Sequence, residues 1–308
     1  MITTVTLNPC IDKTLYLDGF TPGGLNRVAR SRQDPCGKGI NVSKVLAALG
    51  VETRCVGVNY LDNRQLLERE LDTCDIPFRF AVVPGAVRTN VKLFDTRANQ
   101  MTEVNEKGQL LEEAALRLVG QLVREAAPVS DWMVFSGSVP PGVPADFYRE
   151  LMESCAPTPC ALDTDGELFR QGLQAKPALV KPNRWELENY CGRPLRDRRE
   201  VLAAARELLA LGVRWVCVSL GEEGALLAHG REAWYAPVLP VEVRGLQGAG
   251  DSMVAGLCCA RLQNAPAREM LVCAMAAAAG SVSQEGTLLC GKDEFARYYP
   301  LVQAERME

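Results

Sequence analysis

The feature that most constrains the fold is a glycine-rich turn that runs directly into a helix. Three glycines lie within residues 245–250, and small or apolar side chains follow from Ser252 onward. Glycine disfavours the interior of a strand or a helix, whereas the run that follows is typical of a closely packed helix. Residues 248–251 are therefore predicted to form a turn at a helix N-terminus, where unpaired backbone N–H groups and the helix dipole bind anions.

Asp251, the last residue of this turn, allows two interpretations. A carboxylate at a helix N-terminus is most often a cap that accepts hydrogen bonds from backbone N–H groups. Beside an anion-binding turn it can also be a general base, which takes a proton from a hydroxyl that attacks a bound phosphate. The turn by itself favours the cap.

The fold class follows from the alternation of apolar, β-branched runs with helical patterns along most of the chain. This rhythm predicts an α/β fold with a mostly parallel central sheet and helices on both of its faces. Alternating segments at about 13–28 and 87–105 stand apart and predict a small projecting β-sheet, which serves as a lid or as a subunit interface. Because no long linker interrupts the 308 residues, we expect a single domain, 1–308.

Composition restricts the partners and the compartment. The net charge is −4, whereas nucleic-acid-binding domains are usually strongly basic, so we expect no nucleic acid as a partner. The longest apolar tract, residues 271–280, is too short to span a bilayer, and the N-terminus lacks the pattern of a signal peptide. The 12 cysteines include no C-x-x-C pair, and the chain has one histidine, which indicates reduced thiols rather than a zinc site or a disulfide scaffold. We therefore expect a cytoplasmic protein with no membrane contact.

Two stretches near the N-terminus carry candidate ligand-binding residues. In the Asn-Pro-Cys-Ile-Asp stretch at 8–12, Asp12 follows the first predicted strand, where α/β proteins bind ligands, although turn capping is its ordinary role. Residues 36–50 combine a glycine and lysine turn with a helical stripe that ends at Gly50. Within that turn, Gly37 and Gly39 permit close backbone approach, and Asn41 can cap the helix.

Three further patterns lie between the middle of the chain and the glycine turn. Residues 136–142 form a Ser-Gly-Ser-Val-Pro-Pro-Gly loop after a buried strand. Asn183 and Glu186 have the spacing of a capping box, which is the commoner reason for this pattern. Residues 219–224 place two glycines in a turn, for which a hairpin is the ordinary explanation.

Taken together, these stretches resemble the motifs of the ribokinase-like (PfkB) carbohydrate kinases over essentially the whole chain. The resemblance implies that Asp251 is the catalytic base and that Gly248, Ala249 and Gly250 form an anion hole for the transferring phosphoryl group. It also implies contacts with a phosphorylated sugar, in which basic side chains hold the phosphate. The residues implied for that substrate are Asp12, Arg27, Gly37, Lys38, Gly39, Asn41, Arg88 and Ser138.

The same resemblance implies the cofactors and the assembly. ATP would be the phosphoryl donor, and Asn183 and Glu186 would orient Mg²⁺ through water, since Mg²⁺ needs few direct protein ligands. Activation by K⁺ is a further expectation that the sequence leaves open. The small sheet would cover the sugar and pair two chains into a homodimer. The residues implied for the nucleotide are Asn183, Ser219, Gly221, Gly224 and Ser283.

Within the family, the chain looks most like the branch of 1-phosphofructokinases and tagatose-6-phosphate kinases, with fructose 1-phosphate as the favoured substrate. Two residues depart from the usual motifs, namely Leu246 in place of a threonine and Cys36 in place of a glycine. The first departure keeps a non-catalytic sensor of sugar phosphate or nucleotide as the alternative from another class. A dinucleotide-dependent dehydrogenase is disfavoured because no G-x-G-x-x-G pattern opens a helix after a strand.

Overall fold

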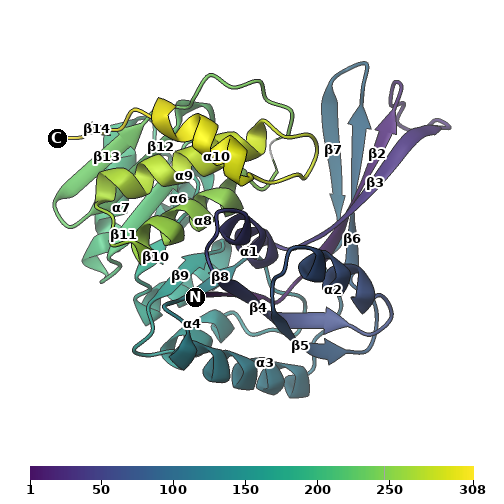
Figure 1. Ribbon diagram of the computed structural model, residues 1–308, viewed down its shortest axis with the longest axis horizontal. Coiled ribbons are helices and arrows are strands. Elements are labelled where there is room, and N and C mark those ends of the chain that lie inside the picture. The colour runs from purple at the N-terminus through teal and green to yellow at the C-terminus, as the bar shows by residue number, and fades with distance from the viewer. Residues whose placement is uncertain (246) are drawn as a thin grey trace.

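The protein folds around a large twisted sheet, from which a small second sheet projects (Figure 1). The structure, a computed structural model, describes residues 1–245 and 247–308. In this part of the chain the large sheet has ten strands, in the order β14-β13-β12-β11-β10-β9-β8-β1-β4-β5. Their bounds are β1 Ile2–Thr6, β4 Thr53–Tyr60, β5 Phe78–Val83, β8 Trp132–Ser136, β9 Cys160–Asp163, β10 Leu179–Val180, β11 Trp215–Ser219, β12 Ala225–His229, β13 Glu232–Ala236 and β14 Glu305–Arg306.

Seven neighbouring strands of this sheet run parallel, namely β5, β4, β1, β8, β9, β10 and β11. The strands β12, β13 and β14 continue the sheet in antiparallel pairing. At the centre, Val5 of β1 pairs with Val56 on one side and Phe135 on the other, and all three side chains are buried. Buried apolar runs of this kind are typical of parallel strands that are covered on both faces. The predicted α/β fold class is confirmed.

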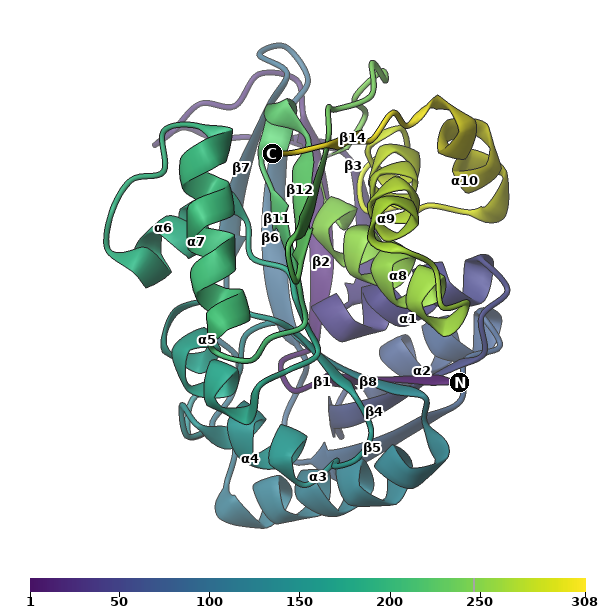
Figure 2. The same cartoon turned by 90° about the vertical axis from the view of Figure 1, so that its left-hand side faces the viewer.

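Helices cover both faces of the large sheet (Figure 2). One layer contains α1 Lys38–Ala48, α2 Arg64–Thr73, α8 Ala249–Leu262, α9 Ala267–Val282 and α10 Lys292–Tyr298. The other contains α3 Glu113–Ala126, α4 Phe147–Glu153, α5 Gly166–Gly172, α6 Arg184–Cys191 and α7 Arg198–Ala210. Helices α8 and α9 pack closely because position 256 is glycine: a Cβ there would lie 2.6 Å from the carbonyl oxygen of Cys273.

The small sheet has the order β3-β2-β6-β7, with β2 Cys10–Leu17, β3 Val28–Cys36, β6 Arg88–Asp95 and β7 Gln100–Asn105. Sequence patterns placed this sheet at about 13–28 and 87–105, so they missed β3. That strand is mostly polar and exposed, and it therefore lacks the alternation that marks a half-buried strand. Figure 1 shows the small sheet projecting away from the rest of the molecule.

None of the helices described here combines the length and the apolar character that crossing a membrane requires.

Candidate active site

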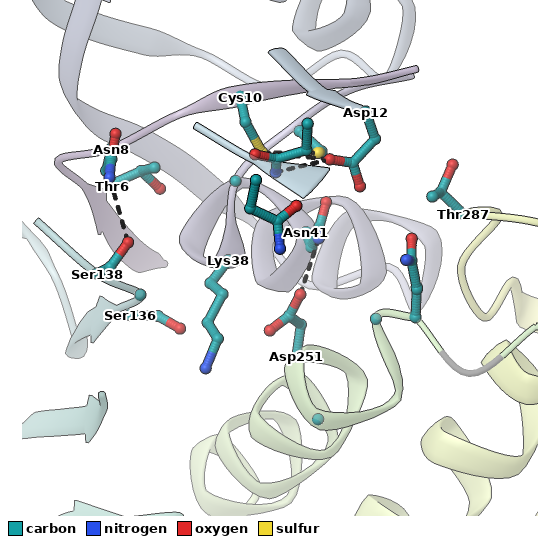
Figure 3. A pocket seen from close by; sticks show the side chains of 18 of the residues that line it. Thr6, Asn8, Cys10, Asp12, Lys38, Asn41, Ser136, Ser138, Asp251 and Thr287 are labelled. Atoms are coloured by element: carbon teal, nitrogen blue, oxygen red, sulfur yellow. Dashed lines mark hydrogen bonds between the residues drawn. The ribbon is translucent and has the colours of Figure 1, made fainter. Parts of the chain in front are cut away.

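A cavity of about 500 Å³ lies between the N-termini of α1 and α8 and the base of the small sheet (Figure 3). Its wall includes residues that follow the C-terminal ends of parallel strands, among them Asn8 after β1, Ser138 after β8 and Lys181 after β10. Open α/β sheets bind ligands outside these ends of their strands. The cavity is therefore the candidate site, and we describe its residues from the glycine turn outward.

Gly248 is the N-cap of α8 and has a φ of 73°, a backbone conformation that favours glycine. A Cβ at this position would lie 2.2 Å from Cδ2 of Leu289, so space is lacking as well. The helix begins at Ala249, earlier than the predicted start at Ser252. Gly248 and Gly250 line the cavity, so the predicted turn lies in its wall, at the helix end whose first N–H groups lack intrahelical partners.

Asp251 lies in the first turn of α8 and faces the N-terminal end of α1 (Figure 3). Its Oδ2 accepts a 2.8 Å hydrogen bond from Nδ2 of Asn41, and no backbone N–H of the described residues donates to its side chain. Burial raises the pKa of Asp251 to about 6, against the opposing effect of the nearby Lys38 ammonium. The structure thus places a buried carboxylate with a raised pKa where the cap interpretation expected hydrogen bonds to backbone N–H groups.

The raised pKa predicts that ionised Asp251 destabilises the fold. The stability that this group contributes is fully present below its ordinary pKa of 3.8 and is lost as the pH rises through about 6. Asp251→Asn should therefore raise the free energy of unfolding at about pH 7.5 by on the order of 1–3 kcal/mol. Urea denaturation at that pH and near pH 4 checks this, because the gain should shrink at the lower pH. A variant no more stable than the wild type at about pH 7.5 would contradict the assignment.

Two lysines converge on Asp163 beside this carboxylate. The Nζ of Lys181 lies 3.2 Å from Oδ1 of Asp163, and the Nζ of Lys38 lies 3.6 Å from Oδ2. Burial alone would raise the pKa of Asp163, but the two lysines and a hydrogen bond from Ser136 hold it below its usual value. Asp163 in turn raises the pKa of Lys38. The side chains of Lys38 and Lys181 therefore stand next to the glycine turn.

Asn183 and Glu186 form the capping box at the start of α6. The backbone N–H of Asn183 donates to Oε2 of Glu186 at 2.8 Å, and the N–H of Glu186 donates to Oδ1 of Asn183 at 2.8 Å. Both residues also line the cavity, and burial raises the pKa of Glu186. The pair therefore caps α6, as the ordinary explanation of its spacing expected. The cap uses Oε2 of Glu186, and Oε1 has no hydrogen bond to the described residues.

At the other end of the cavity, Asp12 is buried and held by two neighbours on β6. Its Oδ1 accepts a 3.0 Å hydrogen bond from Nδ2 of Asn90, and its Oδ2 pairs with Nζ of Lys92. Lys92 also donates to Gln247, whose Nε2 donates to Oε1 of Glu103 on β7 at 2.6 Å. This chain of contacts ties the small sheet to the segment that precedes the glycine turn.

Arg88 lines the same end of the cavity and makes no ion pair within the described residues. Its Nη1 donates to the carbonyl of Glu106 at 2.6 Å and to Oδ1 of Asn90 at 3.2 Å, and its Nη2 donates to the carbonyl of Asn8 at 3.4 Å. Because all of these acceptors are neutral, the guanidinium is fixed in place while its charge is left unbalanced. Such a group suits an anionic ligand.

Most of the residues nominated from the sequence line this cavity, and six do not. Arg27 is exposed in the segment before β3, at the far end of the small sheet, and Gly39 is buried within α1, where a Cβ would lie 2.5 Å from Oγ1 of Thr6.

Ser283 ends α9 and donates to the carbonyl of Gly280, whereas Thr287 reaches the cavity. Leu246 lies outside the described residues. The other nominated residues that do not line it are Ala249, Gly221 and Gly224, the last two in the hairpin between β11 and β12.

Several cavity residues were not nominated from the sequence. A signal for Lys181 was present, because it follows a parallel strand, as ligand-binding residues of α/β folds do. The same signal marks Asp163, which ends a parallel strand and pairs with two lysines of the cavity wall. Asn90, Lys92 and Gln247 carried no such signal, since their partners are distant in the chain.

Comparisons with known proteins identify the family of this chain. A model of the pfkB family of carbohydrate kinases matches residues 5–294. A 1-phosphofructokinase of Rhodobacter capsulatus is 39% identical over 259 residues, which cover 83% of this chain and 82% of that protein. A 1-phosphofructokinase of Xanthomonas campestris pv. campestris is 38% identical over 289 residues, which cover 91% of this chain and 89% of that protein.

Solved structures give the same result. Phosphofructokinase-2 from Escherichia coli in complex with substrates and products superposes with a TM-score of 0.93 at 28% identity, covering 97% of this chain and 98% of that one. The fold and the family together define a phosphotransferase that acts on carbohydrates. The chain belongs to the pfkB family of carbohydrate kinases.

Proposed function

We propose that this kinase transfers the γ-phosphoryl group of ATP to fructose 1-phosphate, as a 1-phosphofructokinase. The observation that carries the proposal is the buried Asp251 carboxylate, which stands at the glycine turn in a cavity that also holds the unbalanced charge of Arg88. A base at one end and a fixed cation at the other suit a substrate that carries both a hydroxyl and a phosphate. The relatives named 1-phosphofructokinase support this choice.

In this mechanism Asp251 accepts the proton of the attacking sugar hydroxyl. A general base works best when its pKa lies near the working pH, and a value of about 6 satisfies that condition better than an ordinary aspartate would. The hydrogen bond from Asn41 fixes the carboxylate, and the N–H groups at Gly248, Ala249 and Gly250 stabilise the transferring phosphoryl group.

The roles that we propose for the basic side chains differ from those expected from the sequence. Lys38 was expected to hold the phosphate already on the sugar, but its ion pair with Asp163 places it beside the glycine turn. We therefore assign Lys38 and Lys181 to the charge of the transferring group, and Arg88 to the sugar's own phosphate. Asp12, Gly37, Asn41 and Ser138 orient the sugar hydroxyls, and Gly39 shapes the turn that lets them approach.

Asn183 and Glu186 fit a hydrated magnesium ion. Carboxylate and amide oxygens suit Mg²⁺, which keeps several waters and needs few protein ligands. When bound, the ion neutralises phosphate charge on the nucleotide. Ser219 lies beside Asn183 through a β-bridge, which supports its place in the nucleotide site together with Gly221, Gly224 and Ser283. K⁺ is a further candidate, since one similar structure is phosphofructokinase-2 from Escherichia coli in complex with potassium.

The chain acts as a single kinase domain with the small sheet as its lid. Val28 and Val104 are 48% and 58% exposed on that sheet, and apolar surface of this kind favours pairing with a second copy of the chain. A homodimer through the small sheet and a cytoplasmic location complete the proposal.

A substrate panel tests the proposed function. With Mg-ATP, turnover should be highest for fructose 1-phosphate among fructose 1-phosphate, fructose 6-phosphate, tagatose 6-phosphate and fructose, measured as ADP release. Preference for fructose 6-phosphate would favour the activity of the phosphofructokinase-2 neighbours, one of which is in complex with that sugar. Preference for tagatose 6-phosphate would favour the other branch considered from the sequence. Binding of ATP and sugar phosphate without any ADP release would favour the sensor.

A further inference from the structure

Two cysteines face each other at the sugar end of the cavity. Cys10 and Cys36 are directly paired in the antiparallel ladder of β2 and β3, and their sulfur atoms lie 3.3 Å apart. Asp12 is two residues beyond Cys10 on β2, so its side chain projects from the same face of the sheet. Its Oδ1 lies 3.5 Å from Sγ of Cys10. Figure 3 shows Cys10 and Asp12 side by side.

The three side chains offer a compact set of ligand atoms. One atom from each of Cys10, Asp12 and Cys36 lies within 4.8 Å of the others, and all three residues line the cavity. We propose that they form a binding site for a thiophilic divalent cation of the Zn²⁺ class. Two thiolates, one carboxylate and an open fourth position toward the cavity are the donor set of such a site.

The geometry requires little movement. Bonds of about 2.3 Å from a tetrahedral zinc ion to two sulfurs separate those sulfurs by about 3.8 Å, which is slightly more than the present contact. Side-chain rotation supplies this difference, because both cysteines, although buried, line the wall of the cavity. The cation therefore fits without a change in strand pairing.

The surroundings of Asp12 complete the site. Asn90 donates to Oδ1 and Lys92 pairs with Oδ2, and contacts of this kind orient a ligating carboxylate. When the cation binds, each thiol releases its proton to solvent, so two protons leave as two positive charges arrive. The net charge next to Lys92 is therefore unchanged, and that ammonium does not oppose binding.

The site differs in chemistry from the Asn183 and Glu186 pair, whose oxygen atoms suit Mg²⁺. It also shares Asp12 with the proposed sugar site. If the proposed function holds, the thiophilic cation and the sugar phosphate compete, and the cation inhibits the kinase. The binding of the cation itself does not depend on that function.

The test uses Co²⁺ as an optical probe on the whole chain, kept reduced by a phosphine. Wild-type protein should bind one Co²⁺ at this site with thiolate-to-cobalt absorption in the near ultraviolet. Changes to residues that only support metal ligands lower metal affinity by about 10- to 100-fold. Cys10→Ala and Cys36→Gly each remove a ligand, so each should lower the affinity for Co²⁺ by more than that. Cys74→Ser is the matched control, since Cys74 is half-buried at the end of α2 and should leave the spectrum unchanged. The melting temperature of each variant without metal verifies its fold.

The outcomes separate the possibilities. Absence of the absorption band in the wild type, or its survival in both variants, would overturn the proposal. A third result would also overturn the proposal. In it, the reduced protein shows no cobalt band, and the two thiols form a disulfide once the reductant is removed, which would identify them as a redox pair. If the band forms but no sugar phosphate is turned over, the cation site stands and the proposed function fails. If fructose 1-phosphate lowers the apparent affinity for Co²⁺, both stand.

Discussion

Asp251→Asn should lower kcat by about 10²- to 10⁴-fold, while the KM values for ATP and sugar phosphate change little. Asparagine keeps the size of the side chain and can still accept the hydrogen bond from Asn41, but it cannot take a proton. The predicted loss therefore falls on the chemical step. Steady-state ADP release, with calorimetric measurement of sugar-phosphate binding, separates kcat from affinity.

The pH dependence of the wild type gives a second measurement of the same group. Because the base is active when ionised, kcat should rise with pH through about 6 and fall as the pH drops below it. This limb should be absent from the residual activity of the asparagine variant. Asp165→Asn is a matched control, since Asp165 is an exposed carboxylate on the same cavity. Equal losses in both variants, or an unchanged pH limb in Asp251→Asn, would contradict the assignment of the base.

The fold was predictable because local patterns and tertiary structure agree along most of the chain. The buried strand β8 is apolar from Trp132 to Phe135, and α3 buries Leu116, Val119 and Val123 at helical spacing. β3 was missed for the opposite reason. Its residues form a strand only because β2 supplies a partner, and no pattern within its own exposed sequence records that pairing.

The candidate site was predictable where one short segment contains all of its parts. The glycine turn and the Asn183 and Glu186 pair are of this kind, although their roles in the reaction stay predictions. Contacts between distant segments were not accessible. The environment of Asp251 depends on Asn41 and Lys38 from another helix, and its raised pKa comes mainly from burial that only the assembled fold produces.

The Cys10 and Cys36 pair illustrates the same limit. From the sequence, Cys36 was only a departure from a glycine motif, and the spacing of the cysteines indicated no metal site. The antiparallel register of β2 and β3 brings the two sulfurs together, and that register follows from a strand that the patterns missed. A site whose ligands meet through strand pairing is therefore invisible to motif spacing.

Arg88→Gln should lower kcat/KM for fructose 1-phosphate by about 10- to 150-fold and leave kcat/KM for unphosphorylated fructose nearly unchanged. The expected loss corresponds to the about 1.5–3 kcal/mol of a hydrogen bond to a charged group. Arg88 suits this role because its partners are neutral carbonyl and amide oxygens, which fix the guanidinium without balancing its charge. Glutamine keeps amide donors for those oxygens, so the main change is the loss of the positive charge.

Comparing the two substrates on the two proteins separates phosphate recognition from structural damage. A residue that binds the sugar's phosphate affects only the substrate that carries it, so the preference for the phosphorylated sugar should fall by the full factor in Arg88→Gln. Arg117→Gln is the control for loss of an arginine, since Arg117 pairs with Glu113 on the exposed face of α3, away from the cavity. If kcat/KM fell equally for fructose and fructose 1-phosphate, Arg88 would instead have a structural role through the carbonyls of Glu106 and Asn8. The phosphate would then have to be held by another cation of the cavity wall, and Lys92 lies at the same end of the cavity as Arg88.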